Sequence, residues 1–223
     1  MSIKLKLISF FYPEHCPFCS AHIEAEEIAC KACMERLKEK QRPILRGAHG
    51  YRCVSSFFYD GTVRRMLIRI KFYARTQHIR QVAAILYKDI AAYYRDIPFD
   101  LITYVPMHLK DKKQRGYNQC ELLAKELGKL SGLPVVTTLE KTKRTKKQHH
   151  LSYAERKTNL RGAFRLINKD ALQDKSILIV DDIITSGYTL GTCAKELNKA
   201  HPQMICCATI ASASADIDKS AVI

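Results

Sequence analysis

The sequence predicts an α/β fold, a parallel sheet flanked by helices, preceded by a small cysteine-rich module. Three observations favour this fold class. Apolar runs typical of buried strands alternate with stretches of helical periodicity, as a parallel sheet with crossover helices requires. One of these runs, 177–180, leads directly into an acidic pair and a glycine-containing turn. Four of the nine cysteines lie in two close pairs before residue 34.

The two cysteine pairs, Cys16-Pro-Phe-Cys19 and Cys30-Lys-Ala-Cys33, predict a zinc site. Each pair places two thiolates on one side of a tight turn, and two such knuckles complete a tetrahedron. Four sulfurs leave no open coordination position, so the Zn²⁺ is expected to be structural. The alternative is a redox-active or coincidental pair. Residues 34–50 are polar and basic and are interpreted as a link, which divides the chain into 1–50 and 51–223.

The elements after the link follow from periodicity and chain breakers. We expect a strand over 53–59, then a helix with an apolar stripe at Val63, Met66, Leu67 and Ile70. A second helix, 79–96, buries Tyr93 and ends before Pro98. These form a helical hood, 51–96, on an α/β core, 97–223. In the core we expect strands at 99–105, 135–139, 177–180 and 204–211, helices at 117–130 (Leu130 buried) and 188–199, a loop at 108–116, and a frayed tail over the last twelve residues.

The segment after the strand 177–180 predicts a site for a phosphorylated sugar. Backbone N–H groups of the turn and the following helix N-terminus cradle an anion, and hydroxyls of Thr185, Ser186 and Thr189 add hydrogen bonds. Asp181 and Asp182 repel a phosphate, but they suit the vicinal hydroxyls of a ribose, or a Mg²⁺ ion near them. The alternative is an ordinary buried strand that ends in a solvated acidic turn.

A second loop is expected to face this turn. Ligands of parallel sheets bind outside the carboxyl ends of the strands, where the loop 106–116 also begins. This loop carries four cationic side chains that would lie near the phosphates: Lys110, Lys112, Lys113 and Arg115.

The charge of the chain predicts a polyanionic partner. The formal net charge is +15 over 223 residues, which favours nucleic acid first and an anionic membrane second. No membrane span or signal peptide is expected, so the protein is assigned to the cytoplasm. Two basic segments, 64–80 and 141–165, are interpreted as a DNA-contacting helix face and a lid, although a solvated face is the alternative for the first. The DNA contacts expected are Arg64, Arg65, Arg69, Lys71, Lys143, Arg144, Lys146, Lys147, Arg156 and Arg161.

Across nearly its whole length, the chain resembles the ComF/GntX phosphoribosyltransferase-like proteins. The resemblance rests on the four-cysteine finger and on segments that include Tyr59-Asp60-Gly61, Val105-Pro106-Met107-His108, Arg115-Gly116-Tyr117-Asn118-Gln119 and the acidic motif. It implies a type I phosphoribosyltransferase core that binds phosphoribosyl pyrophosphate (PRPP) with Mg²⁺. The residues implied are Asp181, Asp182, Thr185, Ser186, Gly187, Tyr188 and Thr189 for PRPP, and Lys113, Arg115, Gly116, Asn118 and Gln119 for a pyrophosphate loop.

The resemblance also implies a role in handling single-stranded DNA during natural competence, with a competence helicase or recombination mediator as a further partner. Asn118 and Gln119 contact the ligand on this interpretation, or else cap the helix that they begin. Two other functions remain open: a salvage phosphoribosyltransferase that acts on a free nucleobase, and a non-catalytic DNA-binding or interaction module on this fold. No side chain is singled out as catalytic.

Overall fold

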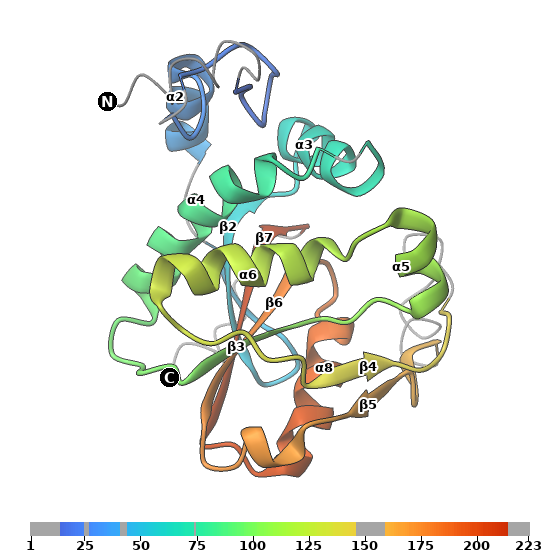
Figure 1. Ribbon diagram of the computed structural model, residues 1–223. Coiled ribbons are helices and arrows are strands. Elements are labelled where there is room, and N and C mark those ends of the chain that lie inside the picture. The colour runs from blue at the N-terminus through green and yellow to red at the C-terminus, as the bar shows by residue number, and fades with distance from the viewer. Residues whose placement is uncertain (1–13, 25–26, 41–43, 74, 146–158, 214–223) are drawn as a thin grey trace, which may run out of the picture.

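The structure, a computed structural model, describes residues 14–24, 27–40, 44–73, 75–145 and 159–213 (Figure 1). Its centre is a five-stranded sheet in the order β1-β2-β7-β6-β3. Strands β2, β7, β6 and β3 run parallel, and β1 pairs antiparallel with β2 at one edge. The predicted parallel sheet is therefore confirmed. The bounds are β1 Ile44–Gly47, β2 Arg52–Phe58, β3 Leu101–Tyr104, β6 Ser176–Ile184 and β7 Met204–Ser212.

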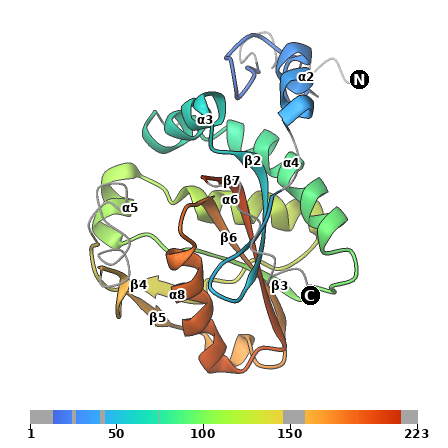
Figure 2. The same ribbon diagram turned by 180° about the vertical axis from the view of Figure 1, so that it is seen from behind.

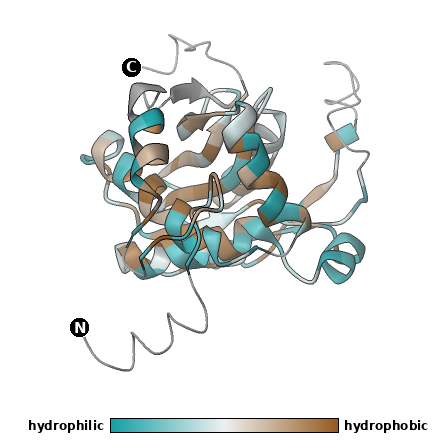
Figure 3. Cartoon of the chain, turned by 90° about the horizontal axis from the view of Figure 1, so that it is seen from above, coloured by the Kyte–Doolittle hydropathy of each residue, from teal (hydrophilic) through white to brown (hydrophobic). Residues whose placement is uncertain are grey.

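Helices cover both faces of this sheet (Figures 1 and 2). Residues of α4 (His78–Tyr93) and α6 (Gln119–Ser131) share one core with Leu178 and Val180 of β6. Helix α8 (Tyr188–Leu197) shares the opposite core with Ile177 and Ile179. Because β6 is buried on both faces, its sequence is a continuous apolar run and does not alternate with polar residues. Figure 3 shows the apolar residues gathered on the inner strands and the hydrophilic residues on the outer helix faces.

The predicted hood 51–96 includes β2 of the sheet, and its helical part begins with α3 (Gly61–Phe72), which Asp60 caps by accepting hydrogen bonds from the N–H groups of Thr62 and Val63. The predicted apolar stripe of this helix is buried at all four positions. In α4 the prediction for Tyr93 is wrong, because that side chain is exposed and Tyr94 is buried instead, donating from its hydroxyl to the carbonyl of Cys207. Leu130 of α6 is likewise exposed.

Three predicted segments differ from the structure. The link 34–50 contains most of α2 (Lys31–Lys40) and all of β1, so residues 44–47 are part of the sheet. The loop 108–116 is a helix, α5 (Leu109–Arg115), which His108 caps at its start and left-handed Gly116 ends. The predicted strand 135–139 pairs with β3 only through an isolated bridge at Val135, because its chain turns away to form β4 (Leu139–Lys141) with β5 (Phe164–Leu166). Two short 3₁₀ helices complete the described elements: Lys169–Ala171 and Asn198–Ala200.

The cysteine module packs against the outer side of the hood (Figure 1). Phe18 lies edge-on to Phe57 of β2, with ring centroids 5.5 Å apart. Arg69 of α3 donates from Nη1 to the carbonyl of Phe18, at 3.3 Å, and to that of Pro17. These contacts join the first knuckle to the helix that follows β2. Within the described ranges, no helix is long and apolar enough to cross a membrane.

Candidate ligand site and zinc centre

The acidic pair lies within strand β6 and does not follow it. The sequence predicted that the strand ends at residue 180, but β6 continues to Ile184 because Asp181 and Ile183 still pair with β7. Both carboxylates are therefore buried, with 8% of Asp181 and 6% of Asp182 exposed. Burying two adjacent charges is costly unless they are paired and hydrogen-bonded, so their partners define the site.

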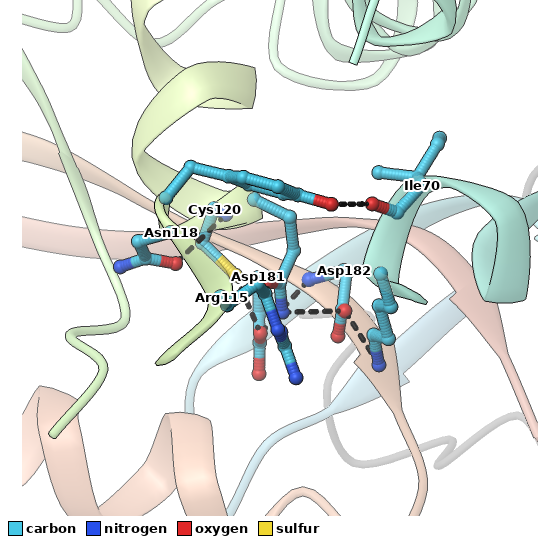
Figure 4. Close-up of polar contacts among 9 residues, drawn as sticks. Ile70, Arg115, Asn118, Cys120, Asp181 and Asp182 are labelled. Carbon is cyan, nitrogen blue, oxygen red and sulfur yellow. Dashed lines mark hydrogen bonds and ion pairs between the residues drawn. The ribbon is translucent and has the colours of Figure 1, made fainter. Parts of the chain in front are cut away.

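Side chains from two helices hold the two carboxylates (Figure 4). Oδ2 of Asp182 lies 2.6 Å from the ammonium of Lys71, on α3, and accepts a hydrogen bond from Gln119 Nε2 at 2.9 Å. Oδ1 of Asp181 accepts from the Cys120 thiol at 3.1 Å and from the backbone N–H of Asp182 at 2.8 Å. The roles of Lys71 and Cys120 were not predicted from the sequence, because strand pairing brings them together from distant positions.

Protonation in this cluster follows from burial and neighbouring charge. Burial and the adjacent Asp182 raise the pKa of Asp181 to about 7. Burial, and then the charges of Asp181 and Asp182, raise the pKa of Cys120, which keeps it a thiol able to donate. Burial lowers the pKa of Lys71, but the neighbouring Asp182 outweighs it and the net change is upward, so Lys71 is an ammonium.

The raised pKa of Asp181 predicts a pH-dependent loss of stability. The folded protein holds this proton more tightly than the unfolded chain, whose aspartates titrate near about 3.9. The stabilisation is therefore present below about pH 4 and is lost as the pH rises through the folded pKa of about 7. Asparagine has the same shape as aspartate but does not titrate, so Asp181→Asn should not lose stability in this way. Urea unfolding at pH 5 and pH 8 should show a smaller decrease for Asp181→Asn than for the wild type; equal decreases would contradict the assignment.

The turn after β6 has the features of an anion cradle. Gly187, the N-cap residue of α8, has φ +74° and has no side chain with which to cap this helix. The Ser186 hydroxyl is buried and has no hydrogen-bond partner among the described residues. Buried polar groups are normally hydrogen-bonded, so the orphaned Ser186 hydroxyl at a helix N-terminus fits a bound phosphate.

Replacing Gly187 in this turn is predicted to destabilise the protein. A Cβ there would lie 3.2 Å from Cα of Ala48, in the connection between β1 and β2, and the left-handed backbone costs an L-residue about 1–2 kcal/mol. We expect Gly187→Ala to lower the free energy of unfolding by at least that amount in urea titrations. The exposed left-handed Gly132, around which a Cβ meets nothing within 4 Å, provides the control. A larger loss at Gly132 would show that the packing against Ala48 is unimportant.

The segment that was predicted as the second loop lies one side chain away from the acidic pair. Arg115 donates from Nη1 to Gln119 Oε1 at 2.6 Å, and Gln119 in turn donates to Asp182. Asn118 caps α6 by accepting from Cys120 N, and its Nδ2 donates to the carbonyl of Val105. The side-chain amide of Asn118 is thus bonded within the protein, as expected if Asn118 caps the helix. Gly116 ends α5 with φ +86°, and Lys113 is exposed on that helix.

The four predicted zinc ligands lie together. The sulfurs of Cys16, Cys19, Cys30 and Cys33 are all within 4.8 Å of one another, and those of Cys19 and Cys30 are 3.6 Å apart. A tetrahedral site with Zn–S bonds of about 2.3 Å places sulfurs about 3.8 Å apart. The cluster therefore fits a structural Zn²⁺.

Two family models match the chain. Residues 115–222 match the phosphoribosyl transferase domain, and residues 7–44 match the double zinc ribbon domain. Competence protein F of Haemophilus influenzae is 26% identical over 197 residues, which cover 83% of this chain and 79% of that protein. The chain is thus similar to competence proteins of the ComF type. The DNA utilization protein YhgH of Salmonella typhi is 29% identical over 186 residues, or 82% of this chain and 77% of that protein. Competence protein ComFC of Bacillus subtilis is 26% identical over 189 residues, which cover 83% of this chain and 73% of that protein.

The predicted DNA-contacting residues of this chain have different surroundings. Arg64 and Arg65 are exposed on α3, whereas Arg69 binds the knuckle carbonyls and Lys71 binds Asp182. Lys143 donates to the carbonyl of Arg161, which is exposed, and Arg144 pairs with Asp111 at 2.9 Å. Lys146, Lys147 and Arg156, together with most of the predicted lid and the C-terminal tail, lie outside the described residues.

Proposed function

We propose that this protein binds PRPP, as its Mg²⁺ complex, at the end of β6. One observation carries the proposal: a buried acidic pair and an anion cradle occupy the same strand end. The acidic pair would accept the ribose hydroxyls, and the cradle at Thr185–Thr189 would hold the 5-phosphate. The Mg²⁺ arrives with its substrate and offsets part of the pyrophosphate charge. The match of residues 115–222 to the phosphoribosyl transferase domain supports this assignment.

The remaining residues of the proposed site would act on the pyrophosphate. Arg115 lies one side chain away from Asp182, and its guanidinium suits bidentate contact with phosphate oxygens. Lys113, Gly116 and Gln119 would complete this loop. Any transfer reaction would then depend on positioning and on stabilising the leaving pyrophosphate, with no covalent nucleophile.

We further propose that the protein handles single-stranded DNA in the cytoplasm during natural competence. The net charge of +15 supports a polyanionic partner, and three relatives are named for competence or DNA utilization. The exposed Arg64, Arg65 and Arg161 are the described residues best placed to contact phosphates. A competence helicase or recombination mediator is proposed as a protein partner, and residues 1–50 and 51–223 as the zinc module and the phosphoribosyltransferase-like domain.

The first experiment measures Mg·PRPP binding by calorimetry and pyrophosphate release with the zinc-loaded protein. Release that depends on single-stranded DNA would make the protein an enzyme acting on nucleic acid. Release with one nucleobase from a panel would instead establish a salvage enzyme. Binding of PRPP without release would leave a DNA-binding protein with a ligand site, whereas no binding would refute the proposal.

The DNA contacts predict a steep dependence on salt. Each phosphate contact releases counterions, so the logarithm of the affinity should fall linearly with the logarithm of the salt concentration. We expect Arg64→Ala combined with Arg65→Ala to weaken the binding of single-stranded DNA equally for all sequences and to reduce this salt slope. Fluorescence anisotropy measures both effects. Lys199→Ala, on an exposed residue beyond α8, serves as the control. A wild-type slope near zero would exclude phosphate contact.

A further inference from the structure

The ion pair between Lys71 and Asp182 places a cation inside the acidic site. The Lys71 ammonium lies 2.6 Å from Oδ2 of Asp182, whose side chain is only 8% exposed. Among the described residues, no other ion pair reaches either carboxylate of the acidic pair. Close ion pairs interact far more strongly in a buried site than in water, so Lys71 strongly offsets the negative charge of Asp182.

Several contacts fix the end of α3 that carries Lys71. Tyr117 donates from its hydroxyl to the carbonyl of Ile70. The guanidinium of Arg115 lies 5.4 Å from the ring centroid of Phe72, at cation–π distance. On the other side of the helix, Arg69 binds the knuckle carbonyls. Lys71 therefore reaches Asp182 from a helix end that is held on both sides.

The hydrogen bonds at the acidic pair leave one oxygen of each carboxylate available. Donors among the described residues use Oδ1 of Asp181 and Oδ2 of Asp182. Oδ2 of Asp181 and Oδ1 of Asp182 take no hydrogen bond from a described residue. Two acceptors on adjacent residues match two neighbouring hydroxyl donors.

The oxygens of Asp181 and Asp182 and the Cys120 sulfur are also close enough to hold a metal ion, all within 4.8 Å. An ammonium already bound to Asp182 opposes a second cation through like-charge repulsion. It also offsets one of the two negative charges that would attract such an ion. The pair with Lys71 thus suits neutral hydroxyl donors better than a divalent ion.

We propose that Lys71 is a specificity-determining residue: it is the resident cation of the acidic pair, which therefore accepts two hydroxyls of a neutral sugar ring and excludes a divalent metal ion. The sugar half of this inference rests on the proposed PRPP site. The metal half depends only on the protein and can be tested without any sugar.

The first test titrates Mn²⁺ into the ligand-free, zinc-loaded protein and follows binding by electron paramagnetic resonance. We expect Lys71→Met to bind Mn²⁺ about tenfold or more tightly than the wild type, because the repelling charge is gone. Lys71→Arg, which keeps the charge, should resemble the wild type. Lys71→Gln, which is neutral but can still donate a hydrogen bond to Asp182, should bind Mn²⁺ like Lys71→Met. It replaces Lys71→Met in the test if that variant does not fold. Lys129→Met removes a lysine whose ion pair with Glu126 is also 2.6 Å, but on the surface, and should change nothing.

The second test measures PRPP affinity by calorimetry at equimolar and at excess Mg²⁺. For Lys71→Met we expect affinity about tenfold lower at equimolar Mg²⁺, with recovery in excess Mg²⁺ as the metal replaces the lost cation. A merely structural lysine would show no such recovery. Equal Mn²⁺ binding by the wild type, Lys71→Met and Lys71→Gln would overturn the inference. Absence of PRPP binding by the wild type would instead refute the proposed function, while the Mn²⁺ result still decides whether Lys71 excludes metal.

Discussion

Cys16→Ser is expected to release the zinc and to detach the N-terminal module from the hood. Cys16 is fully buried, and its sulfur is one of four that converge on a single point. A serine hydroxyl is a poor ligand for Zn²⁺ in a thiolate site, and three remaining sulfurs leave the tetrahedron open. Because zinc binding in such small modules is itself the folding energy, on the order of 10 kcal/mol, its loss should unfold the module.

The effect of Cys16→Ser should extend to the hood. Phe18 packs on Phe57, and the carbonyls of Pro17 and Phe18 accept hydrogen bonds from Arg69. We expect the zinc content, measured by mass spectrometry, to fall from one per chain to near zero, with a lower melting temperature and faster amide exchange in α3. Cys193→Ala, on α8 and outside the cluster, should keep its zinc. Full zinc content in Cys16→Ser would show that the four-sulfur assignment is wrong.

Asp181→Asn combined with Asp182→Asn is expected to abolish PRPP binding while the fold remains. The amides keep the shape of the carboxylates but lose the charge that strengthens hydrogen bonds from hydroxyl donors. Two such bonds to charged acceptors contribute about 1.5–3 kcal/mol each, so the affinity should fall by about a hundredfold or more. The fold should survive because the Asn side-chain oxygens still accept the hydrogen bonds of Lys71 and Gln119, while the loss of the ion pair with Lys71 lowers the stability.

Calorimetry with Mg·PRPP measures this loss, and circular dichroism confirms that the double variant is folded. Asp170→Asn, an exposed acid in the short 3₁₀ helix before β6, is the matched control. Lys71 loses its ion pair in the double variant. The backbone amides near Lys71 should therefore exchange their hydrogens faster. Unchanged PRPP affinity would place the ligand elsewhere on the molecule.

The sequence predicted the chemistry of the site better than its packing. Cysteine spacing identified the zinc cluster, since four ligands close in the chain leave few alternatives. The motif at Asp181–Thr189 and the loop at Arg115 were placed on facing strand ends, because the edge at which parallel strands end is fixed by their direction. Neither inference needed knowledge of side-chain contacts.

The identity of Lys71 and Cys120 as neighbours of the acidic pair could not be predicted. Lys71 lies in a helix of basic residues, where its charge resembles that of Arg64 and Arg65 on the exposed face. Only the parallel pairing of β2 with β7, and of β7 with β6, brings the end of α3 to the acidic pair. The extension of β6 through Asp182 was missed for a related reason. Acidic residues are unfavourable in a buried strand unless partners from other elements compensate them.

Helix α3 makes contact on two sides at residues only two positions apart. Arg69 and Lys71 are separated by about 200° around the helix axis, so one reaches the knuckle while the other reaches Asp182. Inserting or deleting one residue between them would turn Lys71 by about 100° and carry its ammonium away from the carboxylate. This stretch of the chain therefore has a fixed length: insertions accumulate in loops, but here the spacing is set by the two surfaces that the helix must meet at once.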